Sequence, residues 1–306
     1  MAALALYGKH RIIVSDDSDP KFRAWLSELT EQHRDEWNLI LTDGYVSEAH
    51  EPAERAVFVV PDGDADWSAY PPKLPLTDAA GFLQLPFLAL LENWSSDKGF
   101  LLSVATNEQR DFLNKMVARG ALQFENGGGI SNMPKRVQSL TQTVGTNLRM
   151  WAMFDGDALR PGAPSADSER LRVACESGGV PHHQLSRRCI ENYLPQPVIT
   201  SWANRSVKSR PDRTRKLRAF YRMNEAQRFH FNMKNGFRRD AGRTDATADN
   251  LYNGVSAADR TCLADGFDDG IAESFGSGDI SEIDLRADGS WDELSSMVSK
   301  LVALVR

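Results

Sequence analysis

The chain has 306 residues, of which 41% are hydrophobic and 25% are charged, with a formal net charge of −6 at pH 7. This composition is typical of a globular protein of one or two domains, and the acidic balance argues against a protein that holds nucleic acid through its overall charge. The three cysteines lie far apart without zinc-ligand spacing, and no apolar run reaches about 18 residues, so we expect a soluble, cytoplasmic protein without a membrane segment.

Residues 1–78 are predicted to form a small α/β unit of unknown role. Short apolar runs bounded by turn residues predict strands at 11–15, 37–44 and 55–63. After the first of them, Phe22, Trp25, Leu26 and Leu29 recur at helical spacing and predict a helix. The proline-rich stretch 70–78 is the candidate linker to the next unit.

Residues 79–198 alternate strand and helix patterns, which predicts a parallel-rich sheet flanked by helices. The expected order is a strand at 85–93, a helix at 96–120, a strand, glycine turn and helix within 121–144, a strand at 148–157, a helix at 168–179, and a segment at 182–195 that begins as a short strand.

The region 199–306 is predicted to be helical. A basic helical segment covers 212–240, further helices are expected at 256–275 and 290–306, and the last begins with a capping pattern. The aromatic residues of the basic segment are expected to belong to the core rather than to a base-stacking surface; they are Phe220, Tyr221, Phe229 and Phe231.

Three carboxylates follow predicted strands of the second unit: Glu92, Asp155 and Asp157. Ligand sites of open α/β sheets lie beyond the carboxyl ends of the strands. Carboxylate oxygens are suited to one or two Mg²⁺ or Mn²⁺ ions, which polarise a phosphoryl group and activate water. The alternative is that Asp155 and Asp157 only shape a turn, because Asp-Gly is common in turns.

A second copy of the same pattern, Asp62-Gly63-Asp64, also follows a predicted strand. A strand followed by this tripeptide is therefore not decisive. The later copy differs in its surroundings, because a strand-end glutamate and a glycine-rich turn precede it and a basic "RRCIEN" segment follows it. We therefore expect Asp62 and Asp64 to be dispensable for any activity.

The segments "LALLENWSSDKGFL", "FENGGGISNMPK", "WAMFDGDALRPG" and "RRCIENYLP" occur in the order typical of a Toprim (topoisomerase–primase) domain. The sequence resembles most the nuclease-type Toprim domains of the OLD family and related bacterial anti-phage defence proteins. The resemblance covers roughly 85–195 and implies a Toprim-like fold. One departure is that the family commonly places an Asp four residues after the Glu, where this chain has Ser96 followed by Asp97.

The resemblance implies a metal site of two Mg²⁺ or Mn²⁺ ions. Glu92 would be a metal ligand or the general base, Asp155 and Asp157 would hold metal, and Asp97 would complete the shell of one ion. Glu191 is a further candidate ligand, with the alternative that it is an acid at a helix start, favoured by the helix dipole.

Phosphate contacts are implied for residues around this site. Lys234 resembles the basic residue that nuclease Toprim domains place against the scissile phosphate, with a solvated helix face as the alternative. Gly127, Gly128 and Gly129 would let the backbone approach a phosphate or would form a plain turn. Arg187 and Arg188 would grip phosphate or would be surface charge.

The leading hypothesis is a metal-dependent endonuclease that cleaves DNA, with RNA left open, and that acts as the effector of an anti-phage defence system. The chain has no GxxxxGK[ST] motif, so an ATP-driven step requires a separate ATPase partner subunit. Assembly into a homo-oligomer is left open by the sequence.

Three alternatives are weighed against the nuclease. A catalytically degenerate Toprim domain would serve as a docking or sensor subunit. A glycosyltransferase would use the DxD pair to hold Mn²⁺ and a diphosphate, although Glu92 and the "RRCIENYLP" segment disfavour it. A haloacid-dehalogenase-like phosphatase is weaker, because Leu159 stands where that motif needs Thr or Val.

Overall fold

The computed structural model describes residues 2–6, 9–50, 52–205, 207–241, 250–267, 269–277 and 280–306. The chain divides into two compact units, each assembled from segments that are distant in sequence. Unit 1 comprises Met1–Leu88, Asp111–Gln123 and Lys300–Arg306, and unit 2 comprises Ala89–Arg110 and Phe124–Ser299. The sequence predicted three consecutive domains instead.

The first part of unit 1 is mostly helical. Its elements are α1 (Ala2–Leu6), α2 (Pro20–Glu28), α3 (Glu31–His50), β1 (Phe58–Val60), β2 (Lys73–Pro75) and α4 (Leu76–Gln84), and β1 pairs with β2 in parallel. The strand predicted at 55–63 is confirmed at its centre. The strands predicted at 11–15 and 37–44 are wrong, and so is the linker at 70–78, which contains β2 and the start of α4.

Helix α3 explains the wrong strand at 37–44. Its side chains alternate with helical rather than strand periodicity, since Ile40 and Leu41 are buried and Leu39 is 63% exposed. Gly44 lies within the helix, and this position must be glycine because a Cβ there would collide with the backbone carbonyl of Ile12. The glycine thus permits a close contact with the segment 11–15 and does not end the element.

A second sheet has four strands in the order β4-β3-β5-β6. The strands are β3 (Phe87–Leu91), β4 (Leu122–Asn126), β5 (Met150–Phe154) and β6 (His182–Gln184), and β5 pairs with β6 in parallel. All five residues of β5 are buried, as expected for a strand covered on both faces. The four predicted strands of this region are confirmed, and the protein is a mixed α/β protein with small parallel sheets flanked by helices.

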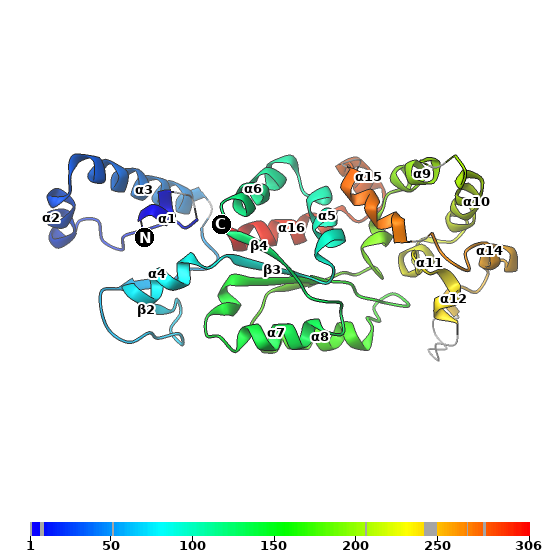
Figure 1. Cartoon of the computed structure of the whole chain (residues 1–306), viewed down its shortest axis with the longest axis horizontal. Coiled ribbons are helices and arrows are strands. Elements are labelled where there is room, and N and C mark those ends of the chain that lie inside the picture. Colours follow the sequence, from blue (N-terminus) through cyan, green and yellow to red (C-terminus); the bar gives the residue numbers. More distant parts are fainter. Residues whose placement is uncertain are drawn as a thin grey trace. The chain divides into compact units, whose positions relative to one another are not determined.

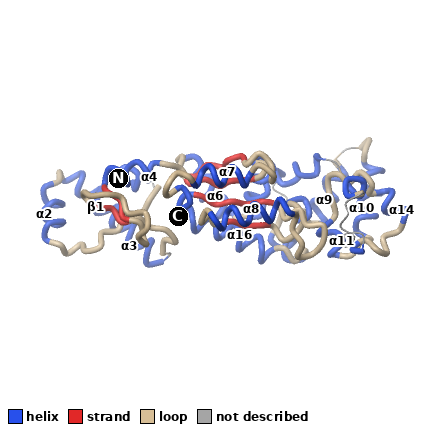
Figure 2. The backbone as a smooth tube through the Cα atoms, turned by 90° about the horizontal axis from the view of Figure 1, so that it is seen from below, coloured by secondary structure: helices blue, strands red, loops and turns tan. Residues whose placement is uncertain are grey.

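Helices cover the sheet as the alternating pattern predicts. Figures 1 and 2 show α7 (Met133–Thr141) and α8 (Ala166–Ser177) side by side along one face, and Figure 1 shows α5 (Trp94–Val104) on the opposite side. The segment 96–120 is mostly helical, as predicted, and contains two helices, α5 and α6 (Asn107–Ala118), separated at Ala105 and Thr106. Before β5 lies the short 3₁₀ helix η1 (Thr146–Arg149).

The rest of the described chain is helical, as predicted. It contains η2 (Ile190–Tyr193), α9 (Gln196–Asn204), α10 (Arg210–Tyr221), α11 (Glu225–His230), α12 (Gly236–Asp240), α14 (Ala257–Cys262), η3 (Asp269–Ser277), α15 (Glu282–Ala287) and α16 (Trp291–Val305). Phe220 and Phe231 are buried and contact each other, which confirms that they belong to the core. No described helix combines the length and apolar character that crossing a lipid bilayer requires.

Candidate carboxylate site at the edge of the sheet

Glu92 and Asp155 follow the ends of β3 and β5, which are neighbours in the sheet. Burial raises the pKa of Asp155 well above its ordinary value, and the charges of Glu92 and Glu191 raise it further. Burial also raises the pKa of Glu92 to about 7, with added repulsion from Asp157 and Asp97. The structure therefore brings the five predicted carboxylates into one electrostatically coupled group.

Asp155 accepts hydrogen bonds from two elements, η2 and α8, and a third element, β6, supports one of these contacts. Its Oδ1 accepts a hydrogen bond of 3.1 Å from the backbone N–H of Ile190 in η2. Its backbone carbonyl accepts one of 2.7 Å from the Ser168 hydroxyl in α8, which in turn accepts one of 2.7 Å from the Gln184 side chain in β6. These contacts fix the first aspartate against the sheet and against η2.

The turn at Gly156 is packed tightly on the segment that follows β6. A Cβ at Gly156 would lie 2.5 Å from the carbonyl oxygen of Leu185, so only glycine fits there. Asp157 has a φ of 47°, the one positive φ of a non-glycine residue in the described chain. Its N–H donates a 2.8 Å hydrogen bond to the carbonyl of Arg188, which holds this uncommon conformation.

The first copy of the tripeptide has different surroundings. Asp62, Gly63 and Asp64 are exposed after β1, and nothing lies within 4 Å of the Cβ that Gly63 lacks. The two copies thus differ in packing as well as in sequence context. Only the copy at 155–157 belongs to the carboxylate group.

Asp97 is 6% exposed at the start of α5. Its Oδ2 accepts a 2.9 Å hydrogen bond from the backbone N–H of Asn93, and its Oδ1 accepts one of 3.2 Å from the Ser96 hydroxyl. Burial nevertheless raises the pKa of Asp97 to about 6. Asp97 therefore stabilises the helix start and adds negative charge to the site.

Glu191 and Lys234 form an ion pair within the site. The Nζ of Lys234 lies 2.9 Å from Oε1 of Glu191, whose side chain is completely buried. Although burial lowers the pKa of Lys234, the charge of Glu191 outweighs this and raises it above its ordinary value. Lys234 lies between α11 and α12 with 36% of its side chain exposed, so it is not on a solvated helix face.

The glycine turn after β4 supports the backbone of Glu92. The N–H groups of Gly127 and Gly129 donate to the carbonyls of Leu91 (2.6 Å) and Glu92 (3.2 Å), and that of Gly128 donates to Oδ1 of Asn126 (3.0 Å). All three N–H groups are thus occupied within the chain. The turn alternative explains this arrangement, and the predicted phosphate contacts of the three glycines are not available in this structure.

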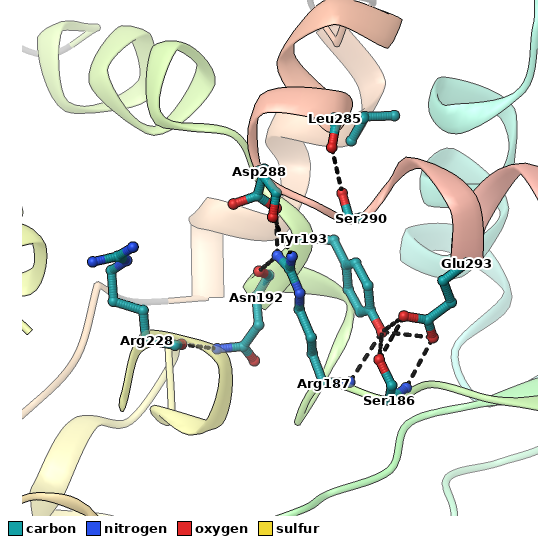
Figure 3. A network of polar contacts seen from close by, with 9 residues as sticks. All are labelled: Ser186, Arg187, Asn192, Tyr193, Arg228, Leu285, Asp288, Ser290 and Glu293. Carbon is teal, nitrogen blue, oxygen red and sulfur yellow. Dashed lines mark hydrogen bonds and ion pairs between the residues drawn. The ribbon is translucent and has the colours of Figure 1, made fainter. Parts of the chain in front are cut away.

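Arg187 and Arg188 are buried, with 5% and 4% of their surface exposed. Arg187 pairs with Asp288 and donates a 2.8 Å hydrogen bond to the carbonyl of Asn192, as Figure 3 shows. Arg188 donates two hydrogen bonds, of 2.6 and 2.8 Å, to the carboxylate of Asp240. Both guanidinium groups therefore stabilise the fold, and neither is the phosphate-binding or surface residue that the sequence suggested.

The sequence interpretation missed the group that anchors η2. The carboxylate of Glu293 in α16 accepts a 2.9 Å hydrogen bond from the Tyr193 hydroxyl and another of 2.9 Å from the backbone N–H of Ser186 (Figure 3). The Tyr193 hydroxyl also accepts a 3.0 Å hydrogen bond from the backbone N–H of Arg187. The tyrosine of the "IENY" segment, Tyr193, could have indicated a buried polar contact, but its partner Glu293 lies 100 residues away in the sequence.

The donor set fits a hard divalent cation. Five carboxylates share this region, Lys234 pairs with one of them, Glu191, and the buried Oε2 atoms of Glu92 and Glu191 have no hydrogen-bond partner in the described part of the chain. Uncompensated buried carboxylates are unfavourable without a cation. Among the described residues, no three His, Cys, Asp or Glu side chains converge closely enough to hold an ion as they stand, so binding requires side-chain rotation.

Searches of protein-family models, of curated proteins and of solved structures found no match to this chain.

Proposed function

We propose that this protein is a metal-dependent endonuclease of the Toprim type, with DNA as its first candidate substrate and RNA as its second. The observation that carries the proposal is the group of Glu92, Asp155 and Asp157 at one edge of the sheet, with the Lys234–Glu191 ion pair beside it. The order of these elements along the chain is that of the Toprim resemblance. The same resemblance supports a role as the cytoplasmic effector of an anti-phage defence system.

After side-chain rotation, Glu92, Asp155 and Asp157 would hold two Mg²⁺ or Mn²⁺ ions, with Asp97 and Glu191 as further ligands. When bound, the ions would polarise the phosphoryl group and lower the pKa of water at the site. In the alternative role implied by the resemblance, Glu92 would be the general base that accepts a proton from the attacking water. Lys234 supplies positive charge where negative charge builds on the phosphate oxygens.

Control by a separate ATPase subunit is part of the proposal. The chain has no phosphate-binding loop of the GxxxxGK[ST] type, so nucleotide hydrolysis would come from a partner. A homo-oligomer would place several such sites in one assembly.

Metal titration with a nicking assay tests the proposed activity. Supercoiled plasmid and a structured RNA are incubated with the purified chain over a range of Mg²⁺ or Mn²⁺ concentrations, and with EDTA. We expect cleavage that depends on metal and that Glu92→Gln abolishes while the circular dichroism spectrum stays unchanged. Cleavage that persists in EDTA or in Glu92→Gln would refute the metal mechanism.

One alternative has an observation in its favour. Because no three potential ligands converge in the described chain, a degenerate Toprim domain that acts as a docking or sensor subunit is the second candidate. It predicts that neither Mg²⁺ nor Mn²⁺ changes the melting temperature and that neither nucleic acid is cleaved.

A further inference from the structure

Helix α10 carries a strongly basic face. Four exposed arginines line a surface groove together with Pro211 and Thr214; they are Arg210, Arg215, Arg218 and Arg222. At 100° per residue, all six lining residues fall within an arc of about 140° of the helix. The arginines extend over thirteen residues, from the first residue of α10 to Arg222 directly after its last, or about 18 Å, so the face is a continuous positive strip on a protein whose net charge is −6.

Half of this charge is not neutralised within the protein. Arg215 pairs with the exposed Asp212, and Arg222 pairs with Asp259. In the described part of the chain, neither Arg210 nor Arg218 has an ion-pair partner. Clustered like charges destabilise a helix when they are left unpaired, so an external anion is the expected counterpart.

We propose that this arginine face of α10 binds the sugar–phosphate backbone of the nucleic acid that the carboxylate site cleaves. The inference rests on the proposed function and names the surface that holds its substrate. The planar guanidinium group of an arginine can donate two parallel hydrogen bonds to the oxygens of one phosphate. The groove has no aromatic side chain for base stacking, so binding is through the backbone and independent of sequence.

An acidic protein partner is disfavoured by the lining of the groove. The centres of protein interfaces are apolar and poor in charge, whereas nucleic-acid interfaces are polar and strongly positive. Of the six described residues that line the groove, one is apolar, Pro211, and the other five are four arginines and a threonine.

The arginine face is connected to the carboxylate site through a chain of contacts within unit 2. Phe220, on the buried side of α10, contacts Phe231 with ring centroids 5.9 Å apart. The carbonyl of Phe231 accepts a 3.0 Å hydrogen bond from the side chain of Asn192, which follows Glu191 in η2. Lys234, three residues after Phe231, pairs with Glu191. A backbone bound on α10 would therefore contact the same compact unit that carries Lys234.

The test separates binding from cleavage. Fluorescence anisotropy in EDTA measures the affinity of the full chain for a fluorescein-labelled, random-sequence DNA duplex and for an RNA duplex, over a series of salt concentrations. The test variant is Arg210→Gln/Arg218→Gln. The matched control is Arg170→Gln/Arg286→Gln, which removes the same charge from exposed arginines on α8 and α15.

We expect the test variant to bind at least about tenfold more weakly than the wild type at moderate salt, with a salt slope reduced by about 2, because each phosphate contact contributes about 0.9. The control should keep the wild-type slope. With metal, the test variant should show a raised KM and a kcat close to wild type. Equal slopes in test and control variants, or no duplex binding by the wild type, would overturn the proposal and favour an acidic protein partner.

The two proposals fail in different ways. Arginine-dependent binding without cleavage would overturn the nuclease and leave the nucleic-acid surface standing. Metal-dependent cleavage with an unchanged KM in Arg210→Gln/Arg218→Gln would overturn the surface and leave the nuclease standing.

Discussion

Lys234 and Glu191 are joined by an Nζ–Oε1 contact of 2.9 Å, and the glutamate has no exposed surface. The lysine, with 36% of its side chain exposed, is the only cation that contacts the buried carboxylate in the described chain. Removal of the two partners should therefore have unequal consequences.

Lys234→Met should lower the free energy of unfolding in EDTA by about 2 kcal/mol, below the roughly 3–5 kcal/mol of a fully buried pair because solvent screens the lysine. Lys234→Met/Glu191→Gln should recover most of this loss, since position 191 then no longer carries a buried charge without its partner. Urea titrations measure the effect, and Lys135→Met on the exposed face of α7 is the control. A double variant less stable than Lys234→Met would show that the pair is not the cause.

Asp155→Asn should reduce kcat at least about a hundredfold, as expected for loss of a group that acts in the transition state. The amide oxygen still accepts the hydrogen bond of Ile190, so the fold should be preserved. The Mg²⁺-dependent increase in melting temperature should shrink, because linkage follows metal affinity. Asp62→Asn, in the exposed copy, should leave both quantities unchanged; a comparable loss there would reverse the assignment of the two copies.

Gly156→Ala should impair cleavage through backbone displacement. The added methyl group would lie 2.5 Å from the Leu185 carbonyl, so Asp155 and Asp157 must move or the segment after β6 must shift. We expect a loss of about 2–3 kcal/mol in stability and a weaker response to metal. Gly81→Ala in α4, where nothing lies within 4 Å of the new Cβ, should be neutral or slightly stabilising. An unaffected Gly156→Ala enzyme would mean that this turn does not position the carboxylates.

Glu293 should make stability depend on acid pH. Burial raises its pKa, but hydrogen bonds from His183, Ser186 and Tyr193 outweigh burial and lower the pKa to about 2. The unfolded chain has the ordinary value near 4.5, so this stabilisation is present above about pH 4.5 and is lost as the pH falls toward 2. At about 1.4 kcal/mol per pH unit it amounts to at most about 3 kcal/mol.

The measurement is the free energy of unfolding between pH 6 and pH 3, in steps, for the wild type and for Glu293→Gln. The variant should be less stable at pH 6 and should show a flatter dependence on pH over this range. Parallel curves for the two proteins would assign the acid sensitivity to other carboxylates.

The sheet and its acidic edge could be predicted because their signals are local. Residues 87–91 form a continuous apolar run, and Glu92 follows it directly. The error at 37–44 arose because a short apolar run has no periodicity that separates a strand from a buried helix. Gly44 looked like the turn that ends a strand, whereas in the structure it permits a contact with Ile12, more than thirty residues earlier.

The roles of Arg187 and Arg188 could not be predicted for a similar reason. Two adjacent arginines resemble a surface cluster in the sequence, and their partners, Asp288 and Asp240, lie 101 and 52 residues away. Their burial depends on tertiary contacts that no local pattern records. The same holds for Glu293, which the sequence shows only as an acid in the first turn of a helix.

The hydrogen bonds that join Tyr193 and Ser186 to Glu293 can form only after Glu293, near the C-terminal end of the sequence, has been synthesised. Every candidate ligand, from Glu92 to Glu191, is synthesised before Asp288 and Glu293. Until those two residues emerge, Arg187 lacks its ion pair with Asp288, and Ser186 and Tyr193 lack the carboxylate of Glu293. The η2 segment of a nascent chain is then held only by its earlier partners, such as Phe231 and Lys234, and the support of the site is complete only after α16 has been translated.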